Sequence, residues 1–517
     1  MIQHPRTLLV SLCLTTACSS AAGTGDTGAD GKEYAALVDL ATDAECHAYA
    51  TEKALDGKPI AADLGALQAL GKYVFFDNIS APPVQACASC HAPSAGWTSG
   101  DSEVNTGQVV VPGAVAERFG NRRPPTVAYA SYTPAFGDSS DDLGCMDEGA
   151  LGLHCQGGLF LDGRAEGNRI GDEVFKGHAV LSDAYGHLLG PLADQALDPF
   201  SNDVEQNVPD GETDLIPGAS FVCQHVQAAT YADLYEQAWG EPVDCADEQD
   251  LSFKRIAVAI AAFEQSAEVN PFSSRRDQAL ECDADSTPGQ FPLQALSDEE
   301  NLGHDLFFGL TSDLNPDGKN ANCALCHNSE SGENPGSAPK QLFTDHRYHH
   351  LGIPPNFERA GFADDVPDTG LAMHTGADRP GHEGSFRTPT LRNVAKMPDE
   401  GFVKSFMHNG YFKNLEDVVH FYNTATLKLD PEACPPGTTA AEARTWDCWP
   451  AAEFDNDSQS QGVGLLGDLG LTPAEEAALV AYLKTLSDEE TVTAPADLVL
   501  DDPSAAAAVF ADTDSTP

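Results

Sequence analysis

Two five-residue segments of the form Cys-x-x-Cys-His constrain this chain more than any other feature. Residues 87–91 read Cys-Ala-Ser-Cys-His, and residues 323–327 read Cys-Ala-Leu-Cys-His. Two thiols three residues apart can add to the two vinyl groups of one haem, and the histidine that follows can bind the iron. One such segment alone is also compatible with a redox dithiol or half a zinc site. Two copies on one chain predict two covalently bound c-type haems.

The two segments name the residues that should hold each haem. For haem 1 they are Cys87, Cys90 and His91. For haem 2 they are Cys323, Cys326 and His327. In each set the cysteines attach the haem and the histidine is the proximal ligand of its iron.

The surroundings of the two segments also repeat. Residues 70–76 and 302–308 each begin with Leu-Gly and end with Phe-Phe, shortly before a haem segment. Downstream, Arg-Pro-Pro-Thr at 123–126 is echoed by Arg-Thr-Pro-Thr at 387–390. Matching landmarks in the same order indicate two related domains that arose by duplication.

Helix signals dominate and strand signals are sparse. Apolar residues recur at helical spacing over 64–76 and over 251–266. Capping boxes at Ser297 and Thr472 predict helices that run to about residues 308 and 486. We therefore expect a mainly α fold of two cytochrome c-like haem domains with long loops and insertions.

Composition and pattern divide the chain into five parts. A signal sequence is expected over 1–18, a flexible tether over 19–35 and an N-terminal haem domain over 36–285. A C-terminal haem domain is expected over 286–490 and an acidic, disordered tail over 491–517. The tail is rich in alanine, proline and aspartate, a composition that cannot bury a core.

The N-terminus has the layout of a secretory signal. Arg6 is followed by the apolar run 8–14 and by small residues up to Cys18. Residues 14–18 also resemble a bacterial lipoprotein cleavage site, so Cys18 is a candidate lipid anchor; ordinary cleavage is the alternative. Either reading places the protein in the periplasm or on the cell surface of a Gram-negative bacterium.

Eight cysteines remain outside the signal and the haem segments, an even number that suggests up to four disulfides in an exported chain. Close spacing favours three pairs and leaves a fourth: Cys145–Cys155, Cys223–Cys245, Cys434–Cys448 and Cys46–Cys282.

The chain is strongly acidic, with 28 Lys and Arg against 80 Asp and Glu, a net charge of −52. Such a surface repels nucleic acid and anionic lipid, and it attracts cationic partner proteins. Solubility alone is an equally simple explanation.

From about residue 64 to residue 486 the chain resembles the bacterial dihaem cytochrome c peroxidase and MauG family. Besides the haem segments, the resemblance is carried by residues 161–164, 195–199, 343–345, 386–394, 407–410 and 415–422. The resemblance implies a peroxide-dependent oxidoreductase with two haems.

In that family a glutamine and a glutamate ten residues apart line the open side of the N-terminal haem. The matching residues here are Gln195 and Glu205, the candidate catalytic pair. Splitting an O–O bond needs a group that takes a proton from one oxygen and gives it to the other, which suits a carboxylate. An amide can position the peroxide without titrating. Taken without the family, Glu205 would be read as a solvated acidic residue.

The resemblance also implies how the irons are ligated. Peroxidases often carry a second histidine about 16 residues after the haem histidine; here Gly107 and Gln108 stand there, so haem 1 should be open to peroxide at rest. For haem 2 the second ligand falls on Tyr422, with Met407 or His408 in reserve. A phenolate stabilises ferric and higher states, whereas a thioether favours the ferrous state.

Two departures from the family pattern concern the space between the haems. Leu161 stands where the family has a tryptophan, and Trp97 falls elsewhere in the pattern. The family's inter-haem calcium site is altered too, with Arg123 in place of an asparagine and Val-Lys-Ser at 403–405 in place of the usual carbonyl segment. A fixed cation can therefore substitute for calcium, which stays uncertain as a cofactor.

These observations predict a peroxidase that reduces hydrogen peroxide at haem 1 with electrons passed through haem 2. The donor would be a small cytochrome c or a cupredoxin. The alternatives are MauG-like oxidation of a partner protein and a plain electron-transfer cytochrome without peroxide chemistry. The oligomeric state is not indicated.

Overall fold

The structure is a computed structural model that describes residues 62–137, 155–282, 291–328, 340–360, 367–375, 382–454 and 465–498. Of residues 62–64, 281 and 282 it describes the backbone alone. The expected signal and tether, and Cys46 and Cys145, lie outside these residues.

The described chain is mainly helical with long loops, as expected. Its α-helices are α2 (Ala62–Phe76), α3 (Cys87–Cys90), α4 (Ser102–Thr106), α5 (Ala179–Tyr185), α6 (Pro191–Gln195), α7 (Asp198–Ser201), α8 (Ala219–Ala228), α9 (Ala232–Trp239), α10 (Gln249–Gln265), α11 (Arg275–Cys282), α12 (Asp298–Phe308), α13 (Ala372–Thr375), α14 (Leu415–Thr424), α15 (Ala440–Trp446) and α16 (Pro473–Lys484). Its 3-10 helices are η2 (Pro93–Ala95), η3 (Ala130–Tyr132), η5 (Asp172–Phe175), η6 (Gly186–Leu189) and η7 (Cys323–Leu325). Strands β1 (Tyr348–His349) and β2 (Phe386–Arg387) pair antiparallel, with Tyr348 opposite Arg387.

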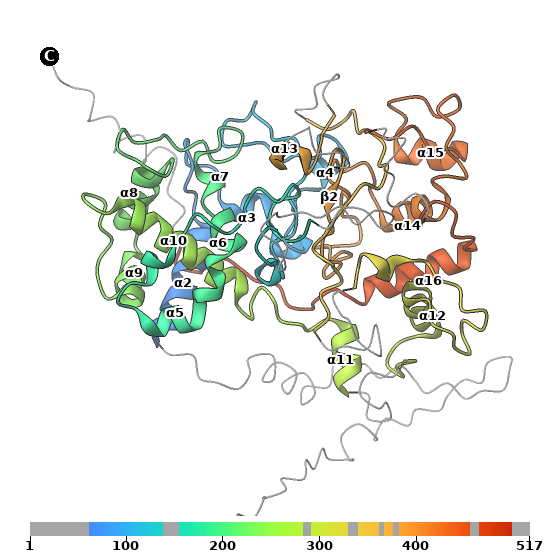
Figure 1. Cartoon of the computed structure of the whole chain (residues 1–517), viewed down its shortest axis with the longest axis horizontal. Coiled ribbons are helices and arrows are strands. Elements are labelled where there is room, and N and C mark those ends of the chain that lie inside the picture. Colours follow the sequence, from blue (N-terminus) through green and yellow to red (C-terminus); the bar gives the residue numbers. More distant parts are fainter. Residues whose placement is uncertain are drawn as a thin grey trace, which may run out of the picture.

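Two helical groups, one from each half of the chain, form separate hydrophobic cores. Figure 1 shows α2, α5, α6 and α8–α10 at one end of the molecule and α12 and α14–α16 at the other. The loops that carry β2 and α13 lie between them. This arrangement fits two cytochrome c-like domains, while the sequence-based bounds 36–285 and 286–490 stay a prediction. Among the described residues, no helix has the length and apolar character needed to cross a bilayer.

Each core is built on one close helix crossing that a glycine makes possible. In the N-terminal core α2 packs along α10, and a Cβ on Gly71 would lie 1.8 Å from the carbonyl oxygen of Ala259. In the C-terminal core α12 packs along α16, and a Cβ on Gly303 would lie 2.0 Å from the carbonyl oxygen of Ala478. The two glycines occupy the same place in the sequence repeat, so the duplication extends to the packing of the helices.

Local signals start the C-terminal helices where the sequence places them. The Ser297 side chain caps α12 by accepting a hydrogen bond from the Glu300 backbone N–H. The Glu300 carboxylate in turn accepts one from the Ser297 backbone N–H, which completes a capping box. Thr472 and Glu475 do the same for α16, with proline at its first position.

Buried ion pairs join the two halves of the chain. Arg122 binds Asp368 through two hydrogen bonds of 2.7 and 2.8 Å, and it also binds Asp162 at 2.7 Å. Arg392 also binds Asp277 through two hydrogen bonds, of 2.7 and 3.0 Å. Removing one partner would leave a buried charge unpaired, so these pairs fix how the halves meet.

Two of the expected disulfides are present, Cys223–Cys245 and Cys434–Cys448. Cys155 is also disulfide-bonded, and its expected partner Cys145 lies outside the described residues. The side chain of Cys282 lies outside them too, so the expected Cys46–Cys282 pair stays a prediction.

The first part of the acidic tail runs back over the N-terminal domain. Val492 and Leu498 pack against its core, and the Tyr73 hydroxyl donates to Asp497. Residues 491–498 are therefore packed against the protein, while 499–517 lie outside the described residues.

The glycine crossing is tested by Gly71→Ala. The added methyl group would collide with the backbone of α10, so we expect the free energy of unfolding to fall by about 1–3 kcal/mol, the usual cost of overpacking. The control is Gly65→Ala on the same helix, where a Cβ meets nothing within 4 Å. It should raise stability by up to about 1 kcal/mol through helix propensity. Equal melting behaviour of the two variants would contradict the crossing.

Candidate haem-binding active site

Each pair of haem-segment cysteines lies on one turn of helix with free thiols. Cys87 and Cys90 are the first and last residues of α3. Cys323 lies on η7, and Cys326 comes directly after that helix. Burial, with the charge of Glu205 adding to it, raises the pKa of the Cys90 thiol to about 12, and burial raises that of Cys323 to about 12. Two thiols on one helical turn, with a histidine directly after them, fit thioether bonds to one haem per segment.

The two histidines are held in the same way. Nδ1 of His91 lies 3.2 Å from the carbonyl oxygen of Trp97, and Nδ1 of His327 lies 2.9 Å from that of Phe343. Burial lowers the pKa of both imidazoles, which favours the neutral ring. With Nδ1–H bonded to a carbonyl, Nε2 is left to bind a metal, which is how proteins orient metal-binding histidines. Both sites therefore fit a haem with a histidine ligand.

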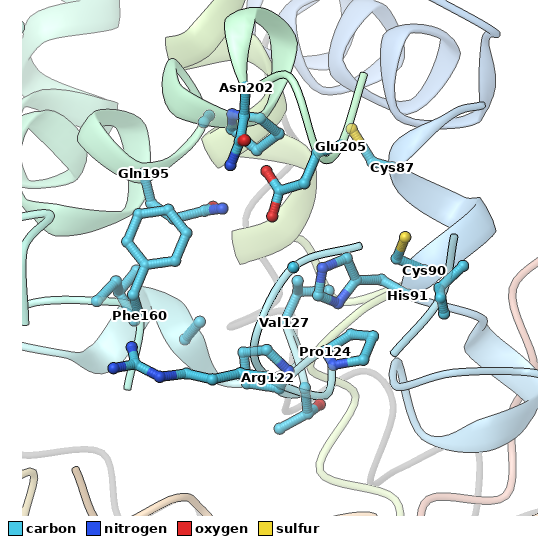
Figure 2. Close-up of a pocket in the computed structure, with 18 of the residues that line it drawn as sticks. Cys87, Cys90, His91, Arg122, Pro124, Val127, Phe160, Gln195, Asn202 and Glu205 are labelled. Atoms are coloured by element: carbon cyan, nitrogen blue, oxygen red, sulfur yellow. The ribbon is translucent and has the colours of Figure 1, made fainter. Parts of the chain in front are cut away.

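A cavity opens beside the first haem segment. Its lining includes Cys87, Cys90 and His91, together with Gln195 at the end of α6 and Glu205 in the loop after α7. Figure 2 shows the Gln195 amide and the Glu205 carboxylate directed into the same space that the His91 ring faces. The structure thus brings the candidate catalytic pair together with the haem 1 attachment residues.

Glu205 is a buried carboxylate with spare hydrogen-bonding capacity. Its Oε2 is buried and has no hydrogen-bond partner among the described residues. Burial raises the pKa of Glu205, although Arg164 and the Asn202 side chain act in the opposite direction. An acidic group of this kind takes up and releases protons more readily near neutral pH than a solvated glutamate does.

Glu264 is a second cavity carboxyl that sequence reasoning missed. It lies near the end of α10, is 3% exposed, and burial raises its pKa to about 8. The available signal was an acidic residue directly after the buried apolar run of that helix. Glu264 is mostly protonated at neutral pH, so it can donate a hydrogen bond into the cavity.

Of the three candidates for the second ligand of haem 2, Tyr422 and Met407 lie next to each other and His408 lies elsewhere. The Tyr422 hydroxyl lies 3.9 Å from the Met407 sulfur. Burial raises the pKa of Tyr422, and the nearby Cys326 and Cys323 raise it further. His408 instead stacks on Phe386 at 3.8 Å, and its Nε2 lies 3.1 Å from a Glu453 oxygen. Tyr422 is therefore placed beside the haem 2 cysteines, with Met407 next to it.

Leu161 and Trp97 occupy different places. Leu161 lines the haem 1 cavity, and its carbonyl accepts a 3.0 Å bond from the Arg387 backbone on β2, so it lies where the two halves meet. Trp97 lies in the N-terminal core against Phe75 and Phe263, at ring distances of 5.7 and 6.1 Å. The indole of Trp97 is thus part of the N-terminal core, and the Trp97 carbonyl is the one that lies next to Nδ1 of His91.

Two basic side chains lie at the junction of the halves, Lys404 buried and Arg123 half-buried. The Lys404 amino group, in a residue only 4% exposed, donates to the carbonyl oxygens of Ala95, Asn393 and Lys396 at 2.9, 3.0 and 3.1 Å. Burial, with the charges of Arg123 and Lys396 adding to it, lowers the pKa of Lys404 well below its usual value. The Arg123 guanidinium donates to the Met407 carbonyl. Neither side chain pairs with a carboxylate in the part of the chain that the structure describes.

One cluster has the spacing of a metal site but belongs to haem 2. Cys326, Asp345 and His349 place ligand atoms within 4.8 Å of one another. His349 lies 2.8 Å from Asp345; although burial lowers its pKa, this bond and the neighbouring thiol raise the pKa to about 10. A protonated imidazole is a poor metal ligand, and Cys326 is one of the two cysteines expected to attach haem 2.

Comparison with known proteins agrees with this geometry. The family model for di-haem cytochrome c peroxidase matches residues 66–285. The chain is 29% identical to the methylamine utilization protein MauG of Paracoccus denitrificans over 432 residues, which is 82% of this chain and 89% of that protein. It is 26% identical to the cytochrome-c peroxidase IdrP2 of Pseudomonas sp. strain SCT over 451 residues, 84% of each chain.

Solved structures give the same result. The chain is similar to the diheme peroxidase BthA of Burkholderia thailandensis, with a TM-score of 0.57 and 26% identity, covering 92% of this chain and 95% of that one. A variant of the same peroxidase gives a TM-score of 0.58 at 25% identity, covering 90% of this chain and 92% of that one. Residues 66–285 thus match the di-haem cytochrome c peroxidase family, and over most of its length the chain is similar to a MauG protein and to a diheme peroxidase.

Proposed function

We propose that the protein reduces hydrogen peroxide at haem 1 and receives the electrons through haem 2. The family makes the chain an oxidoreductase that acts on peroxide. The observation that supports the finer statement is the cavity itself, where Gln195 and Glu205 face the space beside the His91 ring.

Within this proposal each side chain has one task. The haem, when bound through Cys87 and Cys90, supplies the iron that binds peroxide and provides electrons. Glu205 is the base that would take a proton from one peroxide oxygen and deliver it to the other, so that the second oxygen can leave as water. Gln195 donates and accepts hydrogen bonds that hold the peroxide without changing charge. Burial of the Glu205 carboxyl keeps its proton exchange within the cavity.

The electron donor is proposed to be a small redox protein with a cationic face, a cytochrome c or a cupredoxin. The net charge of −52 supports this, since opposite charge accelerates encounter. A second candidate function, oxidation of a partner protein, is supported by Tyr422 beside the haem 2 cysteines. A phenolate there stabilises the oxidised states that such a reaction would draw on.

We further infer that fixed cations take the place of calcium between the haem sites. The Lys404 ammonium is surrounded by three carbonyl oxygens, the ligand type that calcium prefers. A divalent ion would have to displace the Lys404 amino group from these carbonyls, and the nearby Arg123 guanidinium would repel it.

The protein is proposed to act outside the cytoplasm. Disulfides such as Cys223–Cys245 persist in oxidising compartments, which supports export through the signal expected over 1–18. A lipid anchor at Cys18 stays part of this proposal.

Glu205→Gln tests the proton-transfer role. It should keep both haems and lower the rate of peroxide cleavage by about 10²–10⁴-fold, the usual contribution of a general acid–base group. The control Glu236→Gln, an exposed glutamate on α9, should leave the rate unchanged. In the wild type the rate should fall as pH drops through a pKa above that of an ordinary glutamate, because protonated Glu205 cannot accept a proton. If Glu264→Gln causes the loss and Glu205→Gln does not, the role belongs to Glu264.

Tyr422→Phe tests the second ligand of haem 2. Loss of a phenolate ligand should raise the reduction potential of haem 2 and remove any phenolate-to-iron absorption band, as followed by spectroelectrochemistry. Met407→Leu, which alters the neighbouring side chain, should leave both unchanged. The reverse pattern would assign the ligand to Met407.

Lys404→Met tests the fixed cation. It removes one donor from each of three carbonyls: those of Ala95 and Asn393 keep bonds from the Thr98 hydroxyl and the Lys396 backbone, and that of Lys396 loses its donor. The free energy of unfolding should therefore fall by about 1–3 kcal/mol, more than in ordinary surface variants. Lys413→Met is the matched control, because the Lys413 ammonium binds the single carbonyl of Asn105. Prolonged treatment of the wild type with a calcium chelator should change neither haem spectrum nor stability. A chelator-sensitive wild type would contradict the substitution.

A further inference from the structure

Tyr129 occupies a strained position that the second repeat fills with asparagine. Counted from the matching Pro-Thr pairs at 125–126 and 389–390, Tyr129 corresponds to Asn393. Both residues have left-handed backbone conformations, with φ of 61° and 60°. Asparagine tolerates this conformation, whereas a bulky side chain adopts it rarely and at a cost. The first repeat therefore accepts strain in order to place a tyrosine at this point.

The two equivalent residues converge on one carboxylate. The Tyr129 hydroxyl donates to Oδ2 of Asp488 at 2.8 Å, and the Asn393 amide donates to the same oxygen at 2.8 Å. Asp488 follows α16 and thus belongs to the C-terminal half of the chain. Tyr129 is 2% exposed and Asp488 is 4% exposed. A phenol from one half is hydrogen-bonded, away from water, to a carboxylate from the other.

The ring of Tyr129 continues a short series of stacked groups. It packs edge-on against Phe272 at 4.7 Å, and the Arg392 guanidinium lies 5.0 Å from its centre. The same guanidinium lies 5.9 Å from the ring of Phe343. Asp277 binds Arg392 through two hydrogen bonds and also lies 3.5 Å from Arg276, whereas Asp488 is the carboxylate that is hydrogen-bonded to the phenol.

This series connects the proximal sides of the two haem sites. On one side, Val127 and Ala130, which flank Tyr129, line the haem 1 cavity, and His91 lies within hydrogen-bonding reach of the Pro125 carbonyl. On the other side, the carbonyl of Phe343 binds Nδ1 of His327. The saturated side chain of Leu161 offers no comparable route at the point where the halves meet.

We propose that Tyr129 is a redox-active tyrosine that relays electrons between the two haem sites, with Asp488 as its proton acceptor. This proposal rests on the proposed function, because peroxide is the oxidant that creates the demand for electrons at haem 1. The relay is a role of this chain's own residues and does not depend on which donor feeds haem 2.

Reduction of hydrogen peroxide to two waters consumes two protons from solution and two electrons from haem 1, which two successive passages through Tyr129 return one electron at a time. Tyr129 gives one electron toward haem 1 while its O–H bond breaks and the proton passes along the 2.8 Å hydrogen bond to Asp488, leaving a neutral phenoxyl radical. An electron from the haem 2 side then reduces the radical as the proton returns from Asp488. Burial raises the pKa of Asp488, which makes this carboxylate a better proton acceptor.

A purely structural role predicts something different. A phenol that only holds Asp488 in place could be replaced by another group at a cost in stability and with no effect on electron transfer. Asp488 keeps further bonds from Asn393 and from the Ser273 backbone at 3.1 Å, so its position does not depend on Tyr129 alone. The two readings therefore separate experimentally.

The test uses the protein with both haems bound, and three variants. Tyr129→Phe removes the phenol and keeps the ring and its packing. Tyr132→Phe is the matched control, because Tyr132 lies on η3, also packs against Phe272 at 5.9 Å and is 46% exposed. Asp488→Asn keeps the side-chain shape and removes the base. After reduction of both haems, hydrogen peroxide is mixed in a stopped-flow instrument, and the oxidation of haem 1 and of haem 2 is followed separately, in H₂O and D₂O.

We expect haem 1 to react with peroxide equally fast in all four proteins. Oxidation of haem 2 should slow by about tenfold or more in Tyr129→Phe and Asp488→Asn, in line with the roughly 10–100-fold weight of a hydrogen bond to a charged group. It should be unchanged in Tyr132→Phe. The step should be slower in D₂O in the wild type and lose that dependence in Tyr129→Phe. Freeze-quenched wild type should show a tyrosyl radical by electron paramagnetic resonance that Tyr129→Phe lacks.

Two outcomes overturn the proposal and are distinguishable. Unchanged haem 2 oxidation in Tyr129→Phe, with peroxide still consumed at haem 1, would overturn the relay and leave the proposed function intact. A wild type whose haem 1 does not react with peroxide would overturn the proposed function and the relay together.

Discussion

Each haem site depends on the close approach of two helix backbones, which a glycine permits. Gly71 on α2 and Gly303 on α12 let these helices lie directly against α10 and α16, and any side chain at either position would enter the opposite backbone. The helix that carries the glycine leads into the loop that presents the haem cysteines and histidine. Because both crossings use the same position of the repeat, duplication of the chain reproduced the crossing, the attachment segment and the carbonyl-bound histidine as one unit. The chemistry then differs through residues added around that unit.

Among the described residues, the haem 1 cavity and the junction between the halves both contain buried ionisable groups without an oppositely charged partner. On the cavity side, burial raises the pKa values of the Glu205 and Glu264 carboxyls, that of Glu264 to about 8. At the junction, the Lys404 amino group donates to carbonyls alone, and burial lowers its pKa. Transferring such groups from water costs free energy that packing elsewhere must offset. Paired charges such as Arg392 with Asp277 hold the surrounding backbone in place, so the uncompensated groups keep their positions.

What could be predicted from the sequence is what short stretches of chain determine by themselves. The haem segments, the capping boxes of α12 and α16 and the disulfides Cys223–Cys245 and Cys434–Cys448 depend on near neighbours, and the structure has them as expected. The places of Trp97, Glu264 and Lys404 could not be read in this way. Each is set by contacts between segments far apart in the chain: Trp97 with Phe263, Glu264 with the haem 1 cavity, and Lys404 with Ala95. The resemblance to the family placed Gln195 and Glu205, which no local pattern would have singled out.

The two repeats differ most where their equivalent residues face each other. Position for position, Asn393 satisfies the left-handed backbone at little cost, while Tyr129 adopts the same conformation against its preference. A residue that only needed to bind Asp488 could have been asparagine in both repeats, since the Asn393 amide reaches the same oxygen at the same distance. What asparagine lacks is a group that can lose an electron and a proton together. The strain at Tyr129 is therefore best understood through the chemistry of the phenol, and the buried carboxylate between the halves gives that chemistry the proton acceptor it needs.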